Sequence, residues 1–229
     1  MGNFFLSKKQ NVSELSTFYS FLIGFVIALM IGTIILIIQE KNPLETFSLM
    51  FRLSLGSVNS FTSSLNKAVP LILAGLGISI INSVKFWNIG AEGQIFFGAI
   101  AVNYIYINTQ VTNSTMLIFV LLISGFVGGA ICILIPAITK VFFGVNEIIT
   151  TLLTNYIAIG ITIYLINGPW KDPGSLNFPA AEYIGEEVYL PTIFGKLSFG
   201  FIVCITFTVI AFYLKNKSIF GYELRIAGG

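Results

Sequence analysis

Two clusters of polar residues stand inside otherwise apolar sequence, and their side chains are the ones that could hydrogen-bond a solute. The first is KFWNIGAEGQ, residues 85–94, in which two amides, one carboxylate and two glycines fall within seven residues. If a helix is broken here and its freed backbone groups are buried, Asn88, Glu92 and Gln94 border a path through the protein. If the segment is instead a tight turn, Glu92 lies at a helix N-terminus and is stabilised by the helix dipole. The spacing is compatible with both structures.

The second cluster is NEIITTLLTNY, residues 146–156. On a helix, side chains three and four residues apart share one face, and here that face is polar: Glu147, Thr151, Thr154 and Asn155. Such a face should meet protein or water, so it is the second candidate site. The alternative is packing, in which the face hydrogen-bonds other helices and Asn146 caps the helix N-terminus.

Other kinds of chemistry are excluded by the residues that the chain lacks. It has no histidine and only two cysteines, Cys132 and Cys204, each within an apolar run. A zinc site, a Ser-His-Asp triad and a disulfide framework are therefore not expected, and we expect no metal site and no enzyme activity. There is also no phosphate-binding loop of the Gly-x-x-x-x-Gly-Lys-Ser/Thr type. Any work driven by ATP then requires a partner.

The elements that position the two clusters follow from composition. Hydrophobic residues make up 55% of the 229 and charged residues 10%, and the mean hydropathy is +0.90, whereas a soluble domain carries roughly 25% charged residues. A charge near the bilayer centre costs about 3 kcal/mol, so long charge-free apolar runs are expected to cross the membrane.

Such runs lie between Glu14 and Glu40, between Lys67 and Lys85, after Glu147, between Lys196 and Lys215, and twice within residues 93–139, where a polar turn over residues 108–115 separates them. The expected fold is all-α, a polytopic membrane helix bundle of about six transmembrane helices with a broken helix near residues 85–94. No small-x-small cleavage site follows the first run, so we interpret it as a retained anchor.

Basic residues beside short loops predict that the N-terminus is cytoplasmic. The inner side then carries Lys8, Lys9, Lys85, Lys140, Lys215, Lys217 and Arg225, and the outer side carries Lys41, Arg52, Lys67, Lys171 and Lys196. Residues 167–197 become a long outer loop rich in turn-forming residues. The net charge of +2 is small and its basic residues are dispersed, so nucleic acid is not an expected partner.

Two further structural features are expected. Residues 44–64 carry an apolar stripe that predicts a helix at the outer interface, or one merely packed on the outer surface. The glycines Gly125, Gly128 and Gly129, together with Gly75 and Gly77, predict close approach of helices.

Four segments, in order along the chain, resemble membrane permease subunits of ATP-binding-cassette (ABC) importers for simple sugars, nucleosides and branched-chain amino acids. They are FWNIGAEGQ at residues 86–94, NEIITTLLTNYIA at 146–158, GPWKDP at 168–173 with NFP at 177–179, and FGYELR at 220–225. The third segment is similar to the outer loop of permeases paired with basic-membrane-protein-type binding lipoproteins, which are commonly nucleoside importers.

The resemblance implies a single transmembrane permease domain over residues 1–229 that forms the substrate pathway by alternating access in the bacterial inner (plasma) membrane. The implied pathway residues are Asn88, Glu92, Gln94, Asn146, Glu147, Thr151 and Asn155. The implied partners are a cytoplasmic ABC ATPase that uses the ATP, a second permease subunit, a substrate-binding lipoprotein and the lipid bilayer; the chain itself is expected to bind no cofactor.

The resemblance also implies that residues 215–229 begin the cytoplasmic loop that contacts the ATPase, with the contact carried by Phe220, Gly221, Tyr222, Glu223, Leu224 and Arg225. Family members continue past this motif, so we expect the chain to lack the C-terminal part of the domain. Nucleosides are the expected substrate. A simple sugar such as ribose or galactose is the alternative, followed by a secondary transporter coupled through Glu92 or Glu147 and by a membrane scaffold that transports nothing.

Overall fold

The computed structural model describes residues 14–111, 113–175 and 178–228. Lys8, Lys9 and Asn177, which entered the predictions above, lie outside the described residues. The described chain divides into two compact units, one ending at Phe61 and the other beginning at Thr62. Each is built from helices, and the only strands among the described residues form one short hairpin. The expected all-α class is confirmed.

The first unit contains α1 (Glu14–Ile38) and α2 (Pro43–Leu55). Asn42 caps α2, because its Oδ1 accepts the backbone N–H of Leu44 at 3.1 Å and that of Glu45 at 3.4 Å. The prediction of one helix over residues 44–64 is wrong in its extent. The N–H of Gly56 closes the last turn of α2 on the carbonyl of Arg52, and the Ser57 hydroxyl accepts the N–H of Ser60 at 3.1 Å to cap the next helix.

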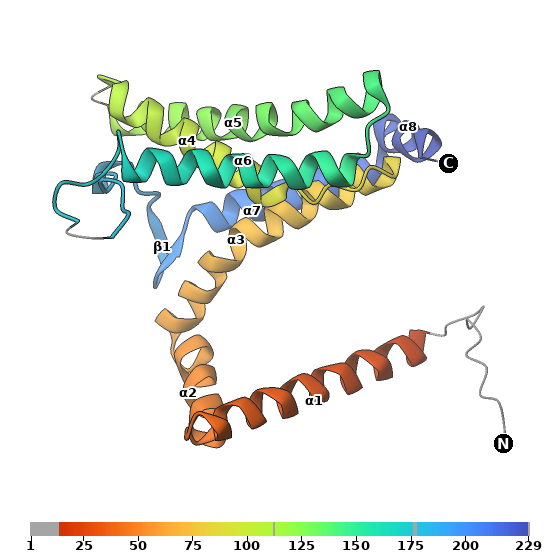
Figure 1. Cartoon of the computed structure of the whole chain (residues 1–229), viewed down its shortest axis with the longest axis vertical. Helices are drawn as coiled ribbons and strands as arrows, with labels where there is room; N and C mark the ends of the chain where they lie inside the picture. Colours follow the sequence, from red (N-terminus) through yellow and green to blue (C-terminus); the bar gives the residue numbers. More distant parts are fainter. Residues whose placement is uncertain (1–13, 112, 176–177, 229) are drawn as a thin grey trace. The chain divides into compact units, whose positions relative to one another are not determined.

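The second unit is formed by most of α3 (Val58–Ile81) and by the short helix η1 (Asn82–Val84), α4 (Ala91–Asn108), α5 (Ser114–Phe143), α6 (Glu147–Asn167), α7 (Gly200–Lys217) and α8 (Ile219–Ala227). Helices α4, α5 and α6 pack against one another, and α8 packs on α7 and η1 (Figure 1).

Five of the described helical segments are long and apolar enough to cross a membrane: Phe18–Ile38, Val58–Val84, Ser114–Phe143, Glu147–Asn167 and Gly200–Lys217. They correspond to five of the six expected spans. The remaining one forms α4, an 18-residue helix that carries Glu92, Gln94 and Asn103 and is too polar to be among the five. The chain is therefore a multi-pass membrane protein whose most polar long helix lies against α5 and α6.

Glycines allow α4 and α5 to approach closely. A Cβ atom added at Gly128 would lie 2.7 Å from both the Cβ of Ala101 and the carbonyl oxygen of Phe97, and one added at Gly98 would lie 3.0 Å from the carbonyl oxygen of Gly125. This confirms the packing predicted for the α5 glycines. The prediction that Gly75 and Gly77 of α3 also mark a close approach of helices is wrong for contacts within this chain. No atom of another element lies within 4 Å of a Cβ added at either glycine.

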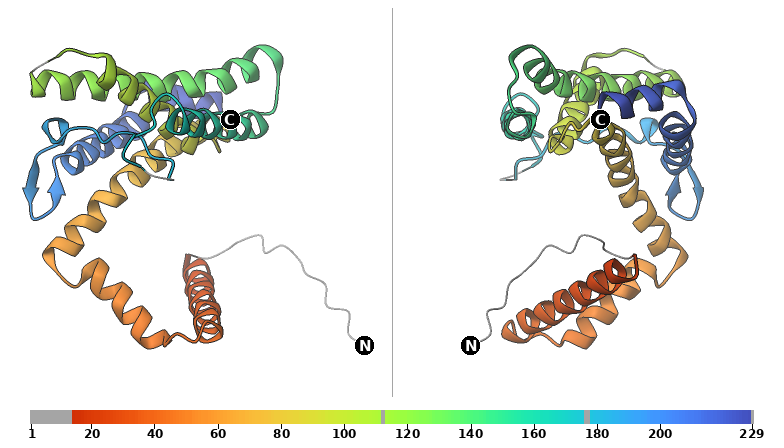
Figure 2. Two further views of the ribbon diagram at one scale, coloured as in Figure 1. Left: turned by 60° about the vertical axis from the view of Figure 1, so that its left-hand side comes forward. Right: turned by 90° about the vertical axis from the view of Figure 1, so that its right-hand side faces the viewer.

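The outer loop expected over residues 167–197 contains the short helix η2 (Glu186–Val188) and a hairpin of β1 (Thr192–Phe194) and β2 (Leu197–Ser198) that leads into α7 (Figure 2). Two side chains of α3 hold the hairpin. The Thr62 hydroxyl accepts the N–H of Lys196 at 3.0 Å, and Asn66 binds the carbonyl of Lys196 and, at 3.0 Å, the N–H of Ser198.

The connections of the second unit gather at two opposite ends (Figure 1). One end holds η1, the α5–α6 connection and α8, and there the Lys215 Nζ donates to the carbonyl of Ser79 at 2.9 Å. The other end holds the α4–α5 turn and the long loop, where the N–H of Gly185 donates to the Tyr106 hydroxyl at 2.9 Å. This is the grouping of connections that the predicted orientation requires.

Candidate functional site

The polar segment before α4 is an extended connection over residues 86–90. It begins at Lys85, whose φ of 55° ends η1 in the left-handed region. Ile89 lies outside the helices, and α6 supplies the partners for its backbone groups. The N–H of Ile89 donates to the Thr151 hydroxyl at 3.2 Å, and the Asn155 Nδ2 donates to the carbonyl of Ile89 at 2.9 Å. The break in the helical path is thus held against a neighbouring helix.

The first turn of α4 is attached to the same asparagine. The N–H of Gly93 donates to the Asn155 Oδ1 at 2.7 Å. A Cβ added at Gly93 would lie 2.7 Å from that oxygen, so the contact requires glycine. The polar face predicted for α6 is the face that packs inside the protein; its buried members are Glu147, Thr151, Thr154, Asn155 and Ala158.

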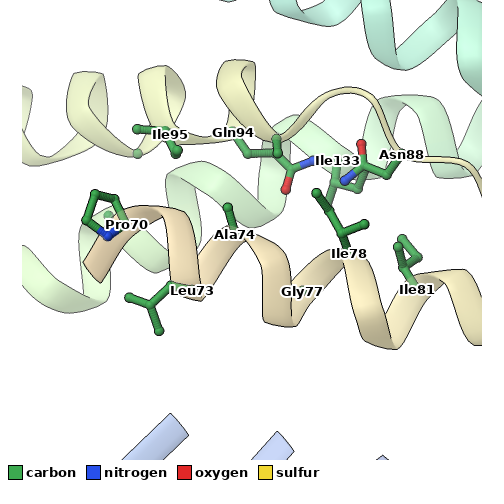
Figure 3. A pocket seen from close by; sticks show the side chains of 13 residues that line it. Pro70, Leu73, Ala74, Gly77, Ile78, Ile81, Asn88, Gln94, Ile95 and Ile133 are labelled. Atoms are coloured by element: carbon green, nitrogen blue, oxygen red, sulfur yellow. The ribbon is translucent and has the colours of Figure 1, made fainter. Parts of the chain in front are cut away.

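Beside this connection lies a cavity of about 500 Å³ between α3, α4 and α5. Its polar side chains are the amides of Asn88 and Gln94, and none of the 13 residues that line it is charged. Figure 3 shows Ala74 and Ile78 of α3 pointing toward these two amides. The volume falls within the roughly 300–1,000 Å³ that is usual for small-molecule sites.

The two amides differ in their partners. The Asn88 Oδ1 accepts the N–H of Gly90 at 2.8 Å, which leaves its Nδ2 as the end that is free to donate. The Gln94 Nε2 is buried and has no hydrogen-bond partner within the described chain. A buried donor without a protein acceptor is rare in folded proteins.

The other predicted site residues lie away from this cavity. Glu92 is exposed in the first turn of α4. Asn146 caps α6, because its Oδ1 accepts the N–H of Ile148 at 2.9 Å. Glu147 forms an ion pair with Lys140, with 2.7 Å between Oε2 and Nζ, and so ties the start of α6 to the last turn of α5. The structure therefore brings Asn88 and Gln94 together at the cavity, and Thr151 and Asn155 together at the connection.

Sequence reasoning missed the opposite wall of the cavity. It is formed by α3 through Pro70, Ala74 and Gly77 and is completed by Gly125 and Ile133 of α5. Pro70 was a possible signal, since a proline inside a membrane helix marks a site where the helix loses a backbone hydrogen bond. The glycine at position 77, interpreted as a packing residue, instead widens the cavity.

The segment expected as the start of a contact loop is helical, because residues 220–225 lie within α8. The Ser218 hydroxyl caps α8 by accepting the N–H of Gly221 at 3.2 Å, and the Arg225 Nη1 donates to the carbonyl of Lys215 at 2.6 Å. A Cβ added at Gly228 would overlap the carbonyl oxygen of Ser83 in η1. The end of α8 is therefore in direct contact with the helix that leads into the 86–90 connection.

Comparison with known proteins gives a match to one family over residues 60–229, described as the permease component of the branched-chain amino acid transport system. No significant match was found among solved structures.

Three curated relatives align with most of the chain. The glucose ABC transporter permease protein TsgB13 of Haloferax volcanii is 30% identical over 88% of this chain and 56% of its own length. The guanosine ABC transporter permease protein NupP of Bacillus subtilis is 28% identical over 95% of this chain and 63% of its own length. The nucleoside ABC transporter permease protein NupB of Lactococcus lactis is 27% identical over 90% of this chain and 59% of its own length. The chain thus spans between 56% and 63% of the length of these relatives.

Proposed function

The chain belongs to the family of permease components of branched-chain amino acid transport systems, and on this premise we propose that it is the permease subunit of an ABC importer for nucleosides. The support is the family match over residues 60–229 together with two relatives that are named as guanosine and nucleoside permeases. Solute would pass through the cavity that Asn88 and Gln94 line.

The observation that carries the proposal is the absence of charge from the cavity lining. Its 13 lining residues include two amides and no charged side chain. A zwitterionic amino acid would have to leave water with two charges, and each of them needs an opposite charge or several hydrogen bonds in a membrane interior. An uncharged solute avoids this penalty. Although the family is described by its amino acid carriers, the cavity favours a neutral substrate.

The proposal includes partners that the chain requires. A cytoplasmic ATPase hydrolyses the ATP, a second permease subunit completes the pathway and a binding lipoprotein delivers the substrate from outside. The assembly lies in the bacterial inner membrane with the N-terminus of this chain in the cytoplasm, and the cavity opens to the two sides alternately. This chain carries out no catalysis and holds no cofactor; α8, with residues 220–225, contacts the ATPase.

A simple sugar is the second candidate substrate, because the relative from Haloferax volcanii is named as a glucose permease and is 30% identical. The two candidates are distinguished on the binding lipoprotein of the same importer. A ligand raises the melting temperature of the protein that binds it, so nucleosides but not ribose, galactose or glucose should stabilise the lipoprotein.

The transport proposal is tested by uptake of radiolabelled purine nucleosides. Deleting the gene should abolish high-affinity uptake, restoring the gene should recover it, and deleting the partner ATPase should have the same effect as deleting the permease. Uptake that is unchanged by the first deletion contradicts the proposal. Uptake that survives loss of the ATPase but disappears with the ion gradient indicates a secondary transporter instead.

A further inference from the structure

We propose that Asn88 and Gln94 determine which nucleoside is carried, by donating hydrogen bonds to the carbonyl edge of an oxo-nucleobase such as hypoxanthine. The inference rests on the proposed nucleoside transport and adds the part of the solute that is recognised, together with the residues that recognise it. It is carried by the two amides, by the aliphatic walls of the cavity and by the hydrogen bond that orients Asn88.

The first step concerns the buried donor. Gln94 lines the cavity, and its Nε2 is buried with no acceptor among the described residues. A buried N–H group without a protein acceptor has an unmet hydrogen bond, which a ligand with an acceptor atom can satisfy.

The second step concerns the orientation of Asn88. Its Oδ1 is occupied by the N–H of Gly90 at 2.8 Å, so this hydrogen bond assigns the amide and directs Nδ2 elsewhere. Figure 3 shows that the Asn88 nitrogen is turned toward Gln94. The polar end of the cavity therefore offers more donors than acceptors, and the complementary group on a solute is a carbonyl oxygen.

The third step concerns the walls. Apart from the two amides, the lining is aliphatic or glycine, and it includes Pro70, Ile78 and Ile133. A nucleobase has two apolar faces and hydrogen-bonding groups only at its edge, so such walls suit it. A hexose has hydroxyl groups around its whole ring, and most of them would lose water without finding a partner. The cavity favours a base over a sugar.

A larger cavity of about 720 Å³ between α3, α5 and α7 makes the contrast clear. Every residue that lines it is apolar, including Leu76, Phe126 and Phe207. It offers no side-chain donor or acceptor, so it cannot recognise the edge of a base. The selecting groups are therefore placed at the smaller cavity.

Inosine and adenosine provide the matched solutes, because they share the ribose and the purine ring and differ only at C6 and N1: inosine has a C6 carbonyl beside an N1–H donor, and adenosine has a C6 amino group beside an N1 acceptor. Uptake of both is measured in cells that carry the complete importer. The preference of the binding lipoprotein is common to all variants, so a change in the inosine-to-adenosine uptake ratio reports on the permease.

Gln94→Leu removes the donor, and we expect it to lower the inosine-to-adenosine ratio about tenfold, the size of effect that the loss of one hydrogen bond produces. Gln94→Met, which keeps the side-chain length and has no amide, should lower it as well. Gln110→Leu makes the same change at an exposed position outside the cavity and should leave the ratio as it is in the native importer.

The outcomes separate the two proposals. If the native importer takes up neither nucleoside, the proposed function fails and the inference fails with it. If it takes up nucleosides and the Gln94 variants, at equal amounts in the membrane, keep the native ratio, the inference alone is overturned. A lower ratio in both Gln94 variants but not in Gln110→Leu supports it.

Discussion

At the scale of single residues, side chains of the same chemical type have two different tasks. Asn155 binds one backbone group within the 86–90 connection and one in the first turn of α4, whereas Asn88 and Gln94 line the cavity. The sequence predicted the polar face of α6 from its periodicity. It could not predict which amide binds the backbone and which lines the cavity. The two hydrogen bonds of Asn155 reach backbone groups that lie 62 and 66 positions away in the sequence.

Asn155→Ala should destabilise the second unit. It leaves the N–H of Gly93 and the carbonyl of Ile89 without the partners that they have at 2.7 and 2.9 Å, and an unsatisfied buried group costs about 1–3 kcal/mol. We expect the melting temperature of the purified protein in detergent to fall by several degrees. Asn155→Asp keeps the acceptor and loses the donor, so its melting temperature should lie between those of the native protein and the alanine variant.

Asn108→Ala is the matched control for this measurement. The Asn108 amide also makes a backbone hydrogen bond, to Tyr104 at 2.8 Å, but in an exposed position at the end of α4 where water can replace it. Its melting temperature should match that of the native protein. Equal melting temperatures for the two alanine variants would contradict a structural role for Asn155.

At the scale of elements, the contact between α4 and α5 depends on small residues and fixes one wall of the cavity. Gly98 and Gly125 line the cavity and also lie where the two helices meet. The sequence indicated the α5 glycines correctly because their spacing places them on one helix face. It did not indicate the role of Gly77, because a glycine that faces another helix and a glycine that faces a cavity follow the same pattern.

Gly128→Ala should push α4 and α5 apart. The added Cβ would lie 2.7 Å from the carbonyl oxygen of Phe97, which is backbone and cannot move by itself. Overpacking of this kind costs about 1–3 kcal/mol, so we expect a lower melting temperature. The control is Gly160→Ala in α6, where no atom lies within 4 Å of the added Cβ.

Alanine is a better helix former than glycine by up to about 1 kcal/mol, so the control variant should melt at the native temperature or above it. If both alanine variants are stabilised, α4 and α5 are not in the close contact described here.

At the scale of the whole molecule, what the sequence predicted best is the grouping of connections. Charges and polar turns predicted that residues 85–90, the α5–α6 connection and residues 215–228 share one side, and the second unit has them at one end (Figure 1). The contact at that end between Gly228, which follows α8, and Ser83 of η1 could not be predicted from the sequence. It is a close approach of two main-chain segments, which leaves no pattern in the sequence.

Helix α6 offers the sharpest test of how these two ends lie relative to a membrane. Its 21 residues span about 31 Å at 1.5 Å per residue, enough to cross a hydrocarbon core of roughly 30 Å. Phe143 lies just before this helix and Tyr183 lies in the long loop after it, with exposed fractions of 75% and 85%. Native Cys132 and Cys204 are each 1% exposed, so they should react little with a thiol reagent.

A membrane-impermeant maleimide should therefore label Tyr183→Cys in intact cells, and should label Phe143→Cys only after the membrane is permeabilised, because the predicted orientation places Lys140 inside and Lys171 outside. The reverse pattern would show that the orientation is inverted while α6 still crosses the membrane. Labelling of both positions in intact cells would contradict α6 as a span. The excess of basic residues on the predicted inner side is small, so the charge distribution determines the orientation only weakly. Labelling on either side of α6 measures that orientation directly.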